Sequence, residues 1–175
     1  KNVELPQFYP LFPFDQFRLG DEEMETFRRT YANGPSFKGM VMSWHQDGIF
    51  FARMGMAEEA AKYTLAKLGD SGRRFPTFWG PGHDWVPDHN WGGSGAIGLQ
   101  EMALQTIGEE IVVLPAWPAD WPVNFRLHAP QATIVTLKYD GKQITQLDVT
   151  PAHRRADVVI PEHVTVAEGV SRSPR

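Results

Sequence analysis

The stretch Pro87-Asp88-His89-Asn90-Trp91-Gly92-Gly93, followed by a segment of small and apolar residues from Ser94 to Ile107, says most about the fold of this 175-residue chain. It sets a carboxylate, two polar side chains and an indole on glycine-rich backbone that leads into a helix. This pattern suits a carbohydrate site, because a carboxylate can activate water and a ring can stack on the face of a sugar. In the competing interpretation, Asp88 is only a turn or cap residue and Trp91 is only a core residue.

The composition limits the class of protein. Hydrophobic residues make up 42% of the chain and charged residues 22%, which is typical of a globular protein. The net charge of −4 argues against nucleic acid or an anionic membrane as the main partner, and no apolar run approaches the ~20 residues that span a bilayer. Because cysteine is absent, disulfides, thiol nucleophiles and cysteine metal sites are excluded.

The order of elements predicts an α+β fold. The proline-rich residues 1–20 are expected to form a buried loop, and the spacing of apolar and capping residues predicts helices over 22–33, 37–54, 57–68 and 94–107, with a long loop over 69–93. The helix over 37–54 is apolar nearly all round, so we expect it to be buried on most faces. Strands are predicted over 110–114, 132–139, 143–149 and 156–160, the middle two joined by a hairpin turn at Asp140-Gly141.

We therefore divide the chain into three parts. Residues 1–108 are expected to be part of a larger helical body (which the resemblance given below identifies as the last hairpins of a barrel), residues 109–163 a small antiparallel β-domain, and residues 164–175 a flexible tail. Because four helices do not enclose the apolar helix over 37–54, we expect the helical part to pack against a preceding part of the same protein or to self-associate.

Several other motifs have a structural interpretation beside a functional one. Residues 93–98 match G-x-G-x-x-G, but no strand precedes them, so we interpret the glycines as sites of close backbone packing. The histidines and carboxylates of residues 83–89 lack the spacing of a zinc site, and no G-x-S-x-G elbow is present, so neither a metal, another cofactor nor a serine nucleophile is predicted. Residues 44–47 either form a paired core network, or Trp44 and His45 line a pocket at a helix end. The pair Arg154-Arg155 is predicted to be a solvated surface.

The segment from Asp88 to Trp121 resembles the end of the catalytic domain of six-hairpin (α/α)6-barrel glycoside hydrolases, above all the inverting α-L-fucosidase family. That family has Asp-Gly-Asn-Phe-Gly, a small-residue helix start, Glu-Met-Leu-Leu-Gln, Leu-Leu-Pro-Ala-Leu-Pro and Trp-Pro. The matching residues here are 88–92, 94–98, 101–105, 113–118 and 121–122, with the Tyr-Pro loop at 9–13 and a tryptophan-bearing segment at 43–45. The resemblance covers residues 5–150.

The resemblance implies that Asp88 is the general base of an inverting hydrolase. Such an enzyme also needs a carboxylic acid that protonates the leaving oxygen. In the family this acid is a Glu on an earlier barrel helix, which no residue of this chain matches; we assign Glu101 a structural role. The chain departs from the family at His89, which replaces a glycine, and at Glu4-Leu5-Pro6-Gln7, which replaces a His-Arg-His stretch.

Two functional hypotheses follow. In the first, the chain is the C-terminal part of a glycosidase acting on α-linked, fucose-like sugars of oligosaccharides or polysaccharides, and by resemblance it is extracellular or periplasmic. In the second, it is a non-catalytic glycan-binding or structural module, because only one catalytic carboxylate is recognised. In the first, Asp88 is catalytic, and the sugar pocket is lined by Trp44, His45, Trp85, His89, Asn90 and Trp91.

Overall fold

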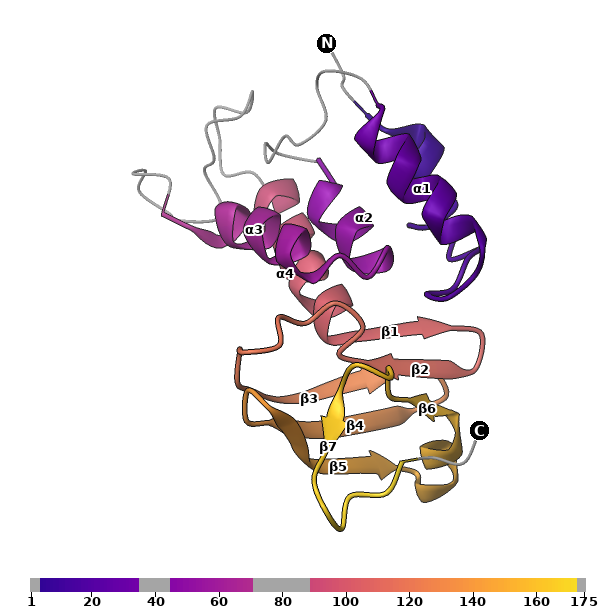
Figure 1. Ribbon diagram of the computed structural model, residues 1–175, viewed down its shortest axis with the longest axis vertical. Helices are drawn as coiled ribbons and strands as arrows, with labels where there is room; N and C mark the ends of the chain where they lie inside the picture. The colour runs from indigo at the N-terminus through magenta and orange to yellow at the C-terminus, as the bar shows by residue number, and fades with distance from the viewer. Residues whose placement is uncertain (1–3, 35–44, 71–88, 173–175) are drawn as a thin grey trace.

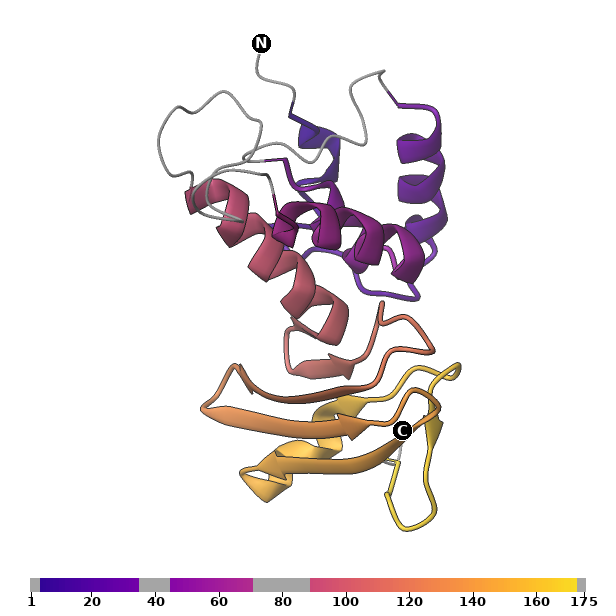
Figure 2. The same cartoon turned by 90° about the vertical axis from the view of Figure 1, so that its left-hand side faces the viewer.

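The computed structural model describes residues 4–34, 45–70 and 89–172 and shows helices followed by strands (Figure 1). The helical part lies at one end of the molecule and the strands lie at the other, with the last helix leading from one to the other (Figures 1 and 2). The elements in chain order are η1 Pro6–Phe8, α1 Glu23–Ala32, α2 Asp47–Arg53, α3 Ala57–Leu68, α4 His89–Ala103, β1 Leu104–Ile107, β2 Glu110–Val113, β3 Val123–Ala129, β4 Thr133–Tyr139, β5 Gln143–Thr150, η2 Ala152–Asp157, β6 Val158–Val159 and β7 Thr165–Val166.

The α+β class is confirmed, and helices α1 and α3 lie where the sequence predicts them. The described helices do not close into a barrel, so the barrel is not part of the fold as observed. The helix predicted over 37–54 begins only at Asp47 in its described part, and every residue of α2 is buried, as its apolar pattern predicts.

Helix α2 lies at the centre of the helical core. The N-terminal segment packs on it, and Phe8 stacks on Phe50 with ring centroids 5.3 Å apart. Tyr31 of α1 meets Phe51 at 4.6 Å, so α1 covers another side of the same helix. The predicted buried loop at the N-terminus is thus confirmed only in part: Leu5, Phe8 and Leu11 are buried, whereas the other described residues up to Gly20 are exposed or half-buried. Aromatic pairs of this kind contribute about 1 kcal/mol each beyond the area they bury.

Helix α4 packs against α3 through small residues. A Cβ at Gly98 would lie 2.9 Å from the Thr64 hydroxyl, and one at Gly95 would lie 3.0 Å from Leu68. This confirms that the G-x-G-x-x-G match serves close packing. Helix α4 spans His89 to Ala103, so the predicted helix over 94–107 began five residues late and ended four residues late. Gly92 and Gly93, which suggested a loop, lie within the helix despite their low helix propensity, and Gly95 and Gly98 make the close contacts with α3.

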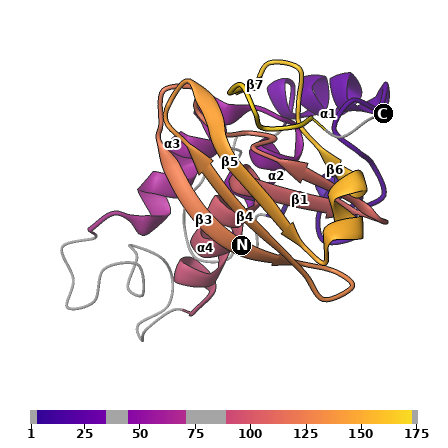
Figure 3. The same cartoon turned by 90° about the horizontal axis from the view of Figure 1, so that it is seen from below.

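The strands form two sheets that share one core. One has the order β1-β2-β6 and the other β3-β4-β5-β7, seen face-on in Figure 3. Buried residues of both meet in a cluster that includes Ile111, Val113, Val135 and Leu137. The prediction of an antiparallel domain is wrong in part, because β6 runs parallel to β2 and β7 parallel to β5.

The hairpin between β4 and β5 forms at Asp140-Gly141, as predicted. Gly141 adopts a φ of 89°, and an Asp140 carboxylate oxygen accepts the amides of Lys142 and Gln143 at 2.8 Å each. These bonds lower the pKa of the Asp140 carboxyl. The predicted strand over 156–160 is reduced to the two residues of β6.

Two predictions for the C-terminal region are wrong. Arg154 is 2% exposed, and its guanidinium donates to the Thr133 hydroxyl at 3.1 Å and the Glu109 carbonyl at 3.1 Å. Of the expected surface pair, Arg154 is therefore a buried structural residue, because a guanidinium can be buried when its donors are satisfied. The predicted tail over 164–175 begins with buried Val164 and strand β7, so its described start is held on the sheet.

A buried arginine joins three segments of the helical part. Arg53 of α2 is 4% exposed. Its Nη2 lies 2.9 Å from a carboxylate oxygen of Asp15, and its Nε lies 2.7 Å from Glu101 of α4. Burial raises the pKa of the Glu101 carboxyl to about 7; the charge of Arg53 opposes this shift and that of Asp15 adds to it. This position supports the structural role assigned to Glu101.

We expect the Glu101 carboxyl to make the protein less stable as the pH rises. Its folded-state pKa lies above the ordinary value of 4.5, so its contribution to the free energy of unfolding is full below about pH 4.5 and is lost by about pH 7. The loss is on the order of 3 kcal/mol.

Urea unfolding of the wild type and of Glu101→Gln between pH 4.5 and 8 checks this expectation, since the variant should gain stability relative to the wild type as the pH rises. Glu58→Gln, on the exposed side of α3, is the control; a wild-type-minus-variant difference that does not change with pH for Glu101→Gln would contradict the expectation.

Candidate functional site

The predicted site residues fall into two groups. Asp88, Trp44 and Trp85 lie outside the described residues. His89 is the first residue of α4, so Asp88 directly precedes this helix in the sequence. His45, Asn90 and Trp91 are described, and they lie near the N-terminal ends of α2 and α4.

Trp91 is a core residue that holds α4 to α3. Its ring is 3% exposed, and its indole N–H donates to the Lys67 carbonyl at 2.7 Å. The Lys67 ammonium lies 5.3 Å from the centre of the same ring and donates to the Ser94 hydroxyl at 2.8 Å. Ser94 in turn donates to the Asn90 carbonyl at 2.6 Å. The ring packs on α3 and lines none of the hollows described below, so the structure gives Trp91 a packing role, and its predicted contact with a sugar stays a prediction.

A small hollow lies beside the N-terminal end of α2, and we call it the acidic hollow. Its volume is about 150 Å³, and its lining includes the predicted residue His45, which is 5% exposed. Leu5 and Phe50 supply apolar surface, whereas the other side chains are polar. The described lining is Glu4, Leu5, Tyr9, His45, Gln46, Asp47 and Phe50.

A second hollow of about 200 Å³ adjoins the first turns of α4, and we call it the helix-start hollow. Asn90 and Ser94 supply its polar groups, and Phe12 supplies an aromatic ring. Gln46 lines both hollows, so they adjoin at this residue, and we call the two together the groove. The groove thus contains His45 and Asn90 of the predicted residues, and it lies at the end of α4 that Asp88 precedes in the sequence.

Hydrogen bonds fix the carboxylates of the acidic hollow. The Tyr9 hydroxyl donates to the Glu4 carboxylate at 2.8 Å, and the Tyr31 hydroxyl donates to the Asp47 carboxylate at 2.6 Å. The pKa of the Tyr9 hydroxyl is raised, first by burial and then by its bond to Glu4 and by the Glu4 charge. Tyr9 therefore remains a proton donor at neutral pH, and it orients the carboxylate that it bonds.

Sequence reasoning missed the contribution of the N-terminal segment to the groove. Glu4 was noted only as a departure from the family pattern, and Tyr9 only as part of a loop. The cis bond between Phe12 and Pro13 and the left-handed φ of 48° at Asp15 belong to the same folded segment, whose path the residue pattern does not reveal. Lys67 was also missed, because it occupies a position that propensity alone assigns to the helix surface.

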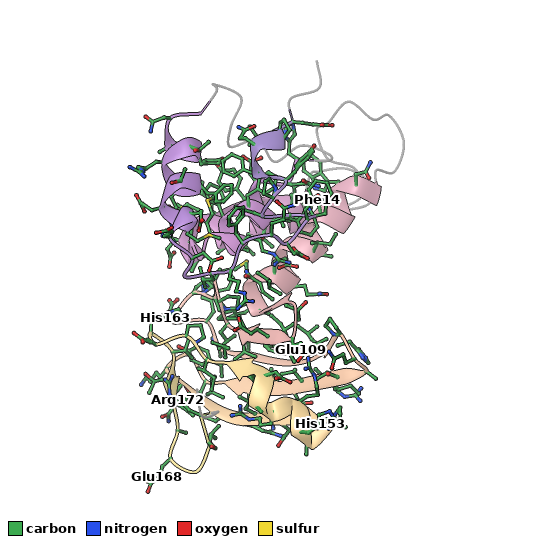
Figure 4. The ribbon with its side chains drawn as sticks, turned by 90° about the vertical axis from the view of Figure 1, so that its right-hand side faces the viewer. Phe14, Glu109, His153, His163, Glu168 and Arg172 are labelled. Carbon is green, nitrogen blue, oxygen red and sulfur yellow. The ribbon has the colours of Figure 1, made fainter. Side chains whose placement is uncertain are left out.

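A larger hollow of about 500 Å³ lies between the helical part and sheet β1-β2-β6. Arg18 and Glu110 both line it and form an ion pair at 3.2 Å, and Arg28, which also lines it, donates to the Met54 carbonyl at 2.6 Å. His163, labelled in Figure 4, is another lining residue. The Arg18–Glu110 pair links the N-terminal segment to β2, and neither His45 nor Asn90 lines this hollow, so we place the candidate site in the smaller groove.

No family model matches the chain, and a search of the curated proteins found no match. Within residues 4–34, 45–70 and 89–172, no group of three His, Asp or Glu residues is placed to hold a metal ion. No helix in the described part of the chain is long and apolar enough to cross a membrane. The function must therefore be argued from the groove and the sequence around it.

We expect Trp91→Phe to destabilise the protein by about 2 kcal/mol, because it removes a buried hydrogen bond and leaves a cavity between α3 and α4. Thermal and urea unfolding measure the loss. Trp121→Phe is the matched control, since Trp121 is partly exposed and none of its described contacts is a hydrogen bond from its indole nitrogen. Equal losses for the two variants would show that the Trp91–Lys67 bond contributes nothing.

Proposed function

We propose that the protein is the C-terminal part of an inverting glycoside hydrolase of the (α/α)6-barrel class, acting on α-linked, fucose-like sugars, with Asp88 as general base. The observation that carries the proposal is the run Asp88-His89-Asn90-Trp91-Gly92, which leads into the helix whose first turns line the groove. A general base must lie within reach of a water on the face of the sugar opposite the leaving group.

The groove supports this proposal by its chemistry. Sugar sites combine ring surfaces, which contact the apolar faces of the sugar, with polar groups that bond its hydroxyls. Tyr9 and Phe12 are partly buried rings at the groove, and Gln46 and Asn90 bring amide groups that both donate and accept. His45 adds an imidazole.

The general acid is assigned to a part of the protein outside these 175 residues, following the resemblance. Glu101 does not qualify, although its pKa of about 7 is the value a general acid would need. It is 7% exposed, it is paired with Arg53, and it lines none of the hollows described above. A catalytic acid must contact the substrate, so geometry outweighs the pKa here.

The alternative is a glycan-binding module without chemistry. It is favoured by the carboxylates of the acidic hollow, Glu4 and Asp47, because each already accepts a hydrogen bond from a tyrosine and so resembles an orienting group. Under this alternative, glycan binding survives Asp88→Asn and the complete protein hydrolyses nothing.

Exposed apolar side chains on the helical part support packing against another protein surface. Phe14 is 62% exposed (labelled in Figure 4). Leu65 of α3 is 53% exposed, and Ile97 and Leu99 of α4 are 41% and 38% exposed. We propose that the preceding part of the same protein covers them, or else a second copy. An extracellular or periplasmic location remains a prediction from the resemblance.

We expect Asp88→Asn to lower the hydrolysis of the preferred α-linked oligosaccharide by about 100-fold or more, because a general base contributes roughly 10²–10⁴ in rate. The measurement is turnover by the complete protein on a panel of α-linked fucosides, galactosides and related oligosaccharides. Asp148→Asn, on the exposed face of β5, is the control and should retain full activity. Turnover unchanged in Asp88→Asn would refute the assignment, and wild-type inactivity across the panel would favour the binding module.

A further inference from the structure

We propose that the acidic hollow is a subsite for one uncharged sugar unit and that Glu4 is the residue that rejects sugars carrying a carboxylate or sulfate. The proposal rests on the proposed function, since it assumes that the groove binds a carbohydrate. It concerns the choice among sugars, which the motif around Asp88 does not address.

The charges of the lining carry the argument. Glu4 and Asp47 line the hollow, and none of its seven described lining residues is Arg or Lys. An anionic group that entered this hollow would approach the Glu4 carboxylate, and like charges at such short distances repel each other.

The opposite end of the groove has a different character. Lys67 is 2% exposed and donates to Ser94, which lines the helix-start hollow. The acidic hollow therefore contains the Glu4 carboxylate, whereas the helix-start hollow is lined by Ser94, which accepts a hydrogen bond from the buried Lys67 ammonium. We locate the rejection of anionic sugars at the acidic end only.

Glu4 also has the geometry to bind a neutral sugar. The described structure gives its carboxylate one hydrogen bond, from Tyr9 at 2.8 Å, and a carboxylate has about four acceptor positions. A sugar hydroxyl can donate to those that remain, whereas a uronate carboxylate has no proton to give. Specificity then comes from an attractive contact to one ligand and a repulsive contact to the other.

The size of the hollow limits the ligand to one ring. Its volume of about 150 Å³ lies below the roughly 300–1,000 Å³ of sites that enclose a drug-sized ligand. Leu5 and Phe50 give this space apolar surface that can face the C–H groups of a sugar ring. The rest of an oligosaccharide would extend past Gln46, which joins the two hollows.

The test uses matched pairs of ligands on the complete protein. The probes are the methyl α-glycosides of galactose, glucose and mannose, each beside the methyl glycoside of its uronic acid, with galactose 6-sulfate as a second anion. Binding is measured at neutral pH and low salt by saturation-transfer NMR and calorimetry. We expect the wild type to bind the preferred neutral glycoside at least about 5-fold more tightly than its uronate, with the preference shrinking as salt is added.

Glu4→Gln removes the charge but keeps the size and an acceptor for Tyr9, so it should lower this preference several-fold. Glu168→Gln is the control, since it removes the same charge from an exposed loop at the far end of the β part (Figure 4). Equal binding of uronates by the wild type, or an unchanged preference in Glu4→Gln, would overturn the subsite while leaving the proposed function standing. If no sugar of either kind binds and the oligosaccharide panel is not hydrolysed, both proposals fail.

Discussion

The buried Arg53 holds both walls of the candidate groove. One wall is the N-terminal segment, where Arg53 forms an ion pair with Asp15, and the other is α4, where it forms an ion pair with Glu101. Removing one partner of a buried ion pair typically costs about 3–5 kcal/mol, because the remaining charge has lost its compensation. The network therefore helps to fix the N-terminal segment relative to α4, although it lines no part of the groove.

Helix α4 extends this constraint into the β part. It passes directly into β1 at Leu104, and the next residue, Gln105, is 2% exposed. The Gln105 amide donates to the Ala52 carbonyl at 2.8 Å and to the Glu101 carbonyl at 2.9 Å. One side chain thus ties the start of the sheet to α2 and to α4. The strands serve the groove indirectly, since they fix the far end of the helix whose first turns line it.

Local patterns predicted the elements whose partners lie close in sequence. Helix α3 and the Asp140-Gly141 hairpin were predicted because caps, spacing and turn residues act over a few positions. The start of α4 was not, because glycines have low helix propensity and Gly92 and Gly93 therefore indicated a loop. Strand β3 was missed, since its alternating half-exposed residues follow a proline-rich connector. The burial of Arg154 was not predicted either, because its guanidinium donates to Thr133 and Glu109, which lie far away in sequence.

The candidate site shows the same division. His45 and Asn90 were predicted to line the sugar pocket of a glycosidase, and they line the groove. Trp91 has the same neighbours in sequence but faces α3, because its indole N–H requires an acceptor and the Lys67 carbonyl supplies it. Glu4 reaches the groove from the other end of the chain. The recognised motif therefore supplies only one wall, and the selectivity of any ligand depends equally on the N-terminal segment, where the chain departs from the family it resembles.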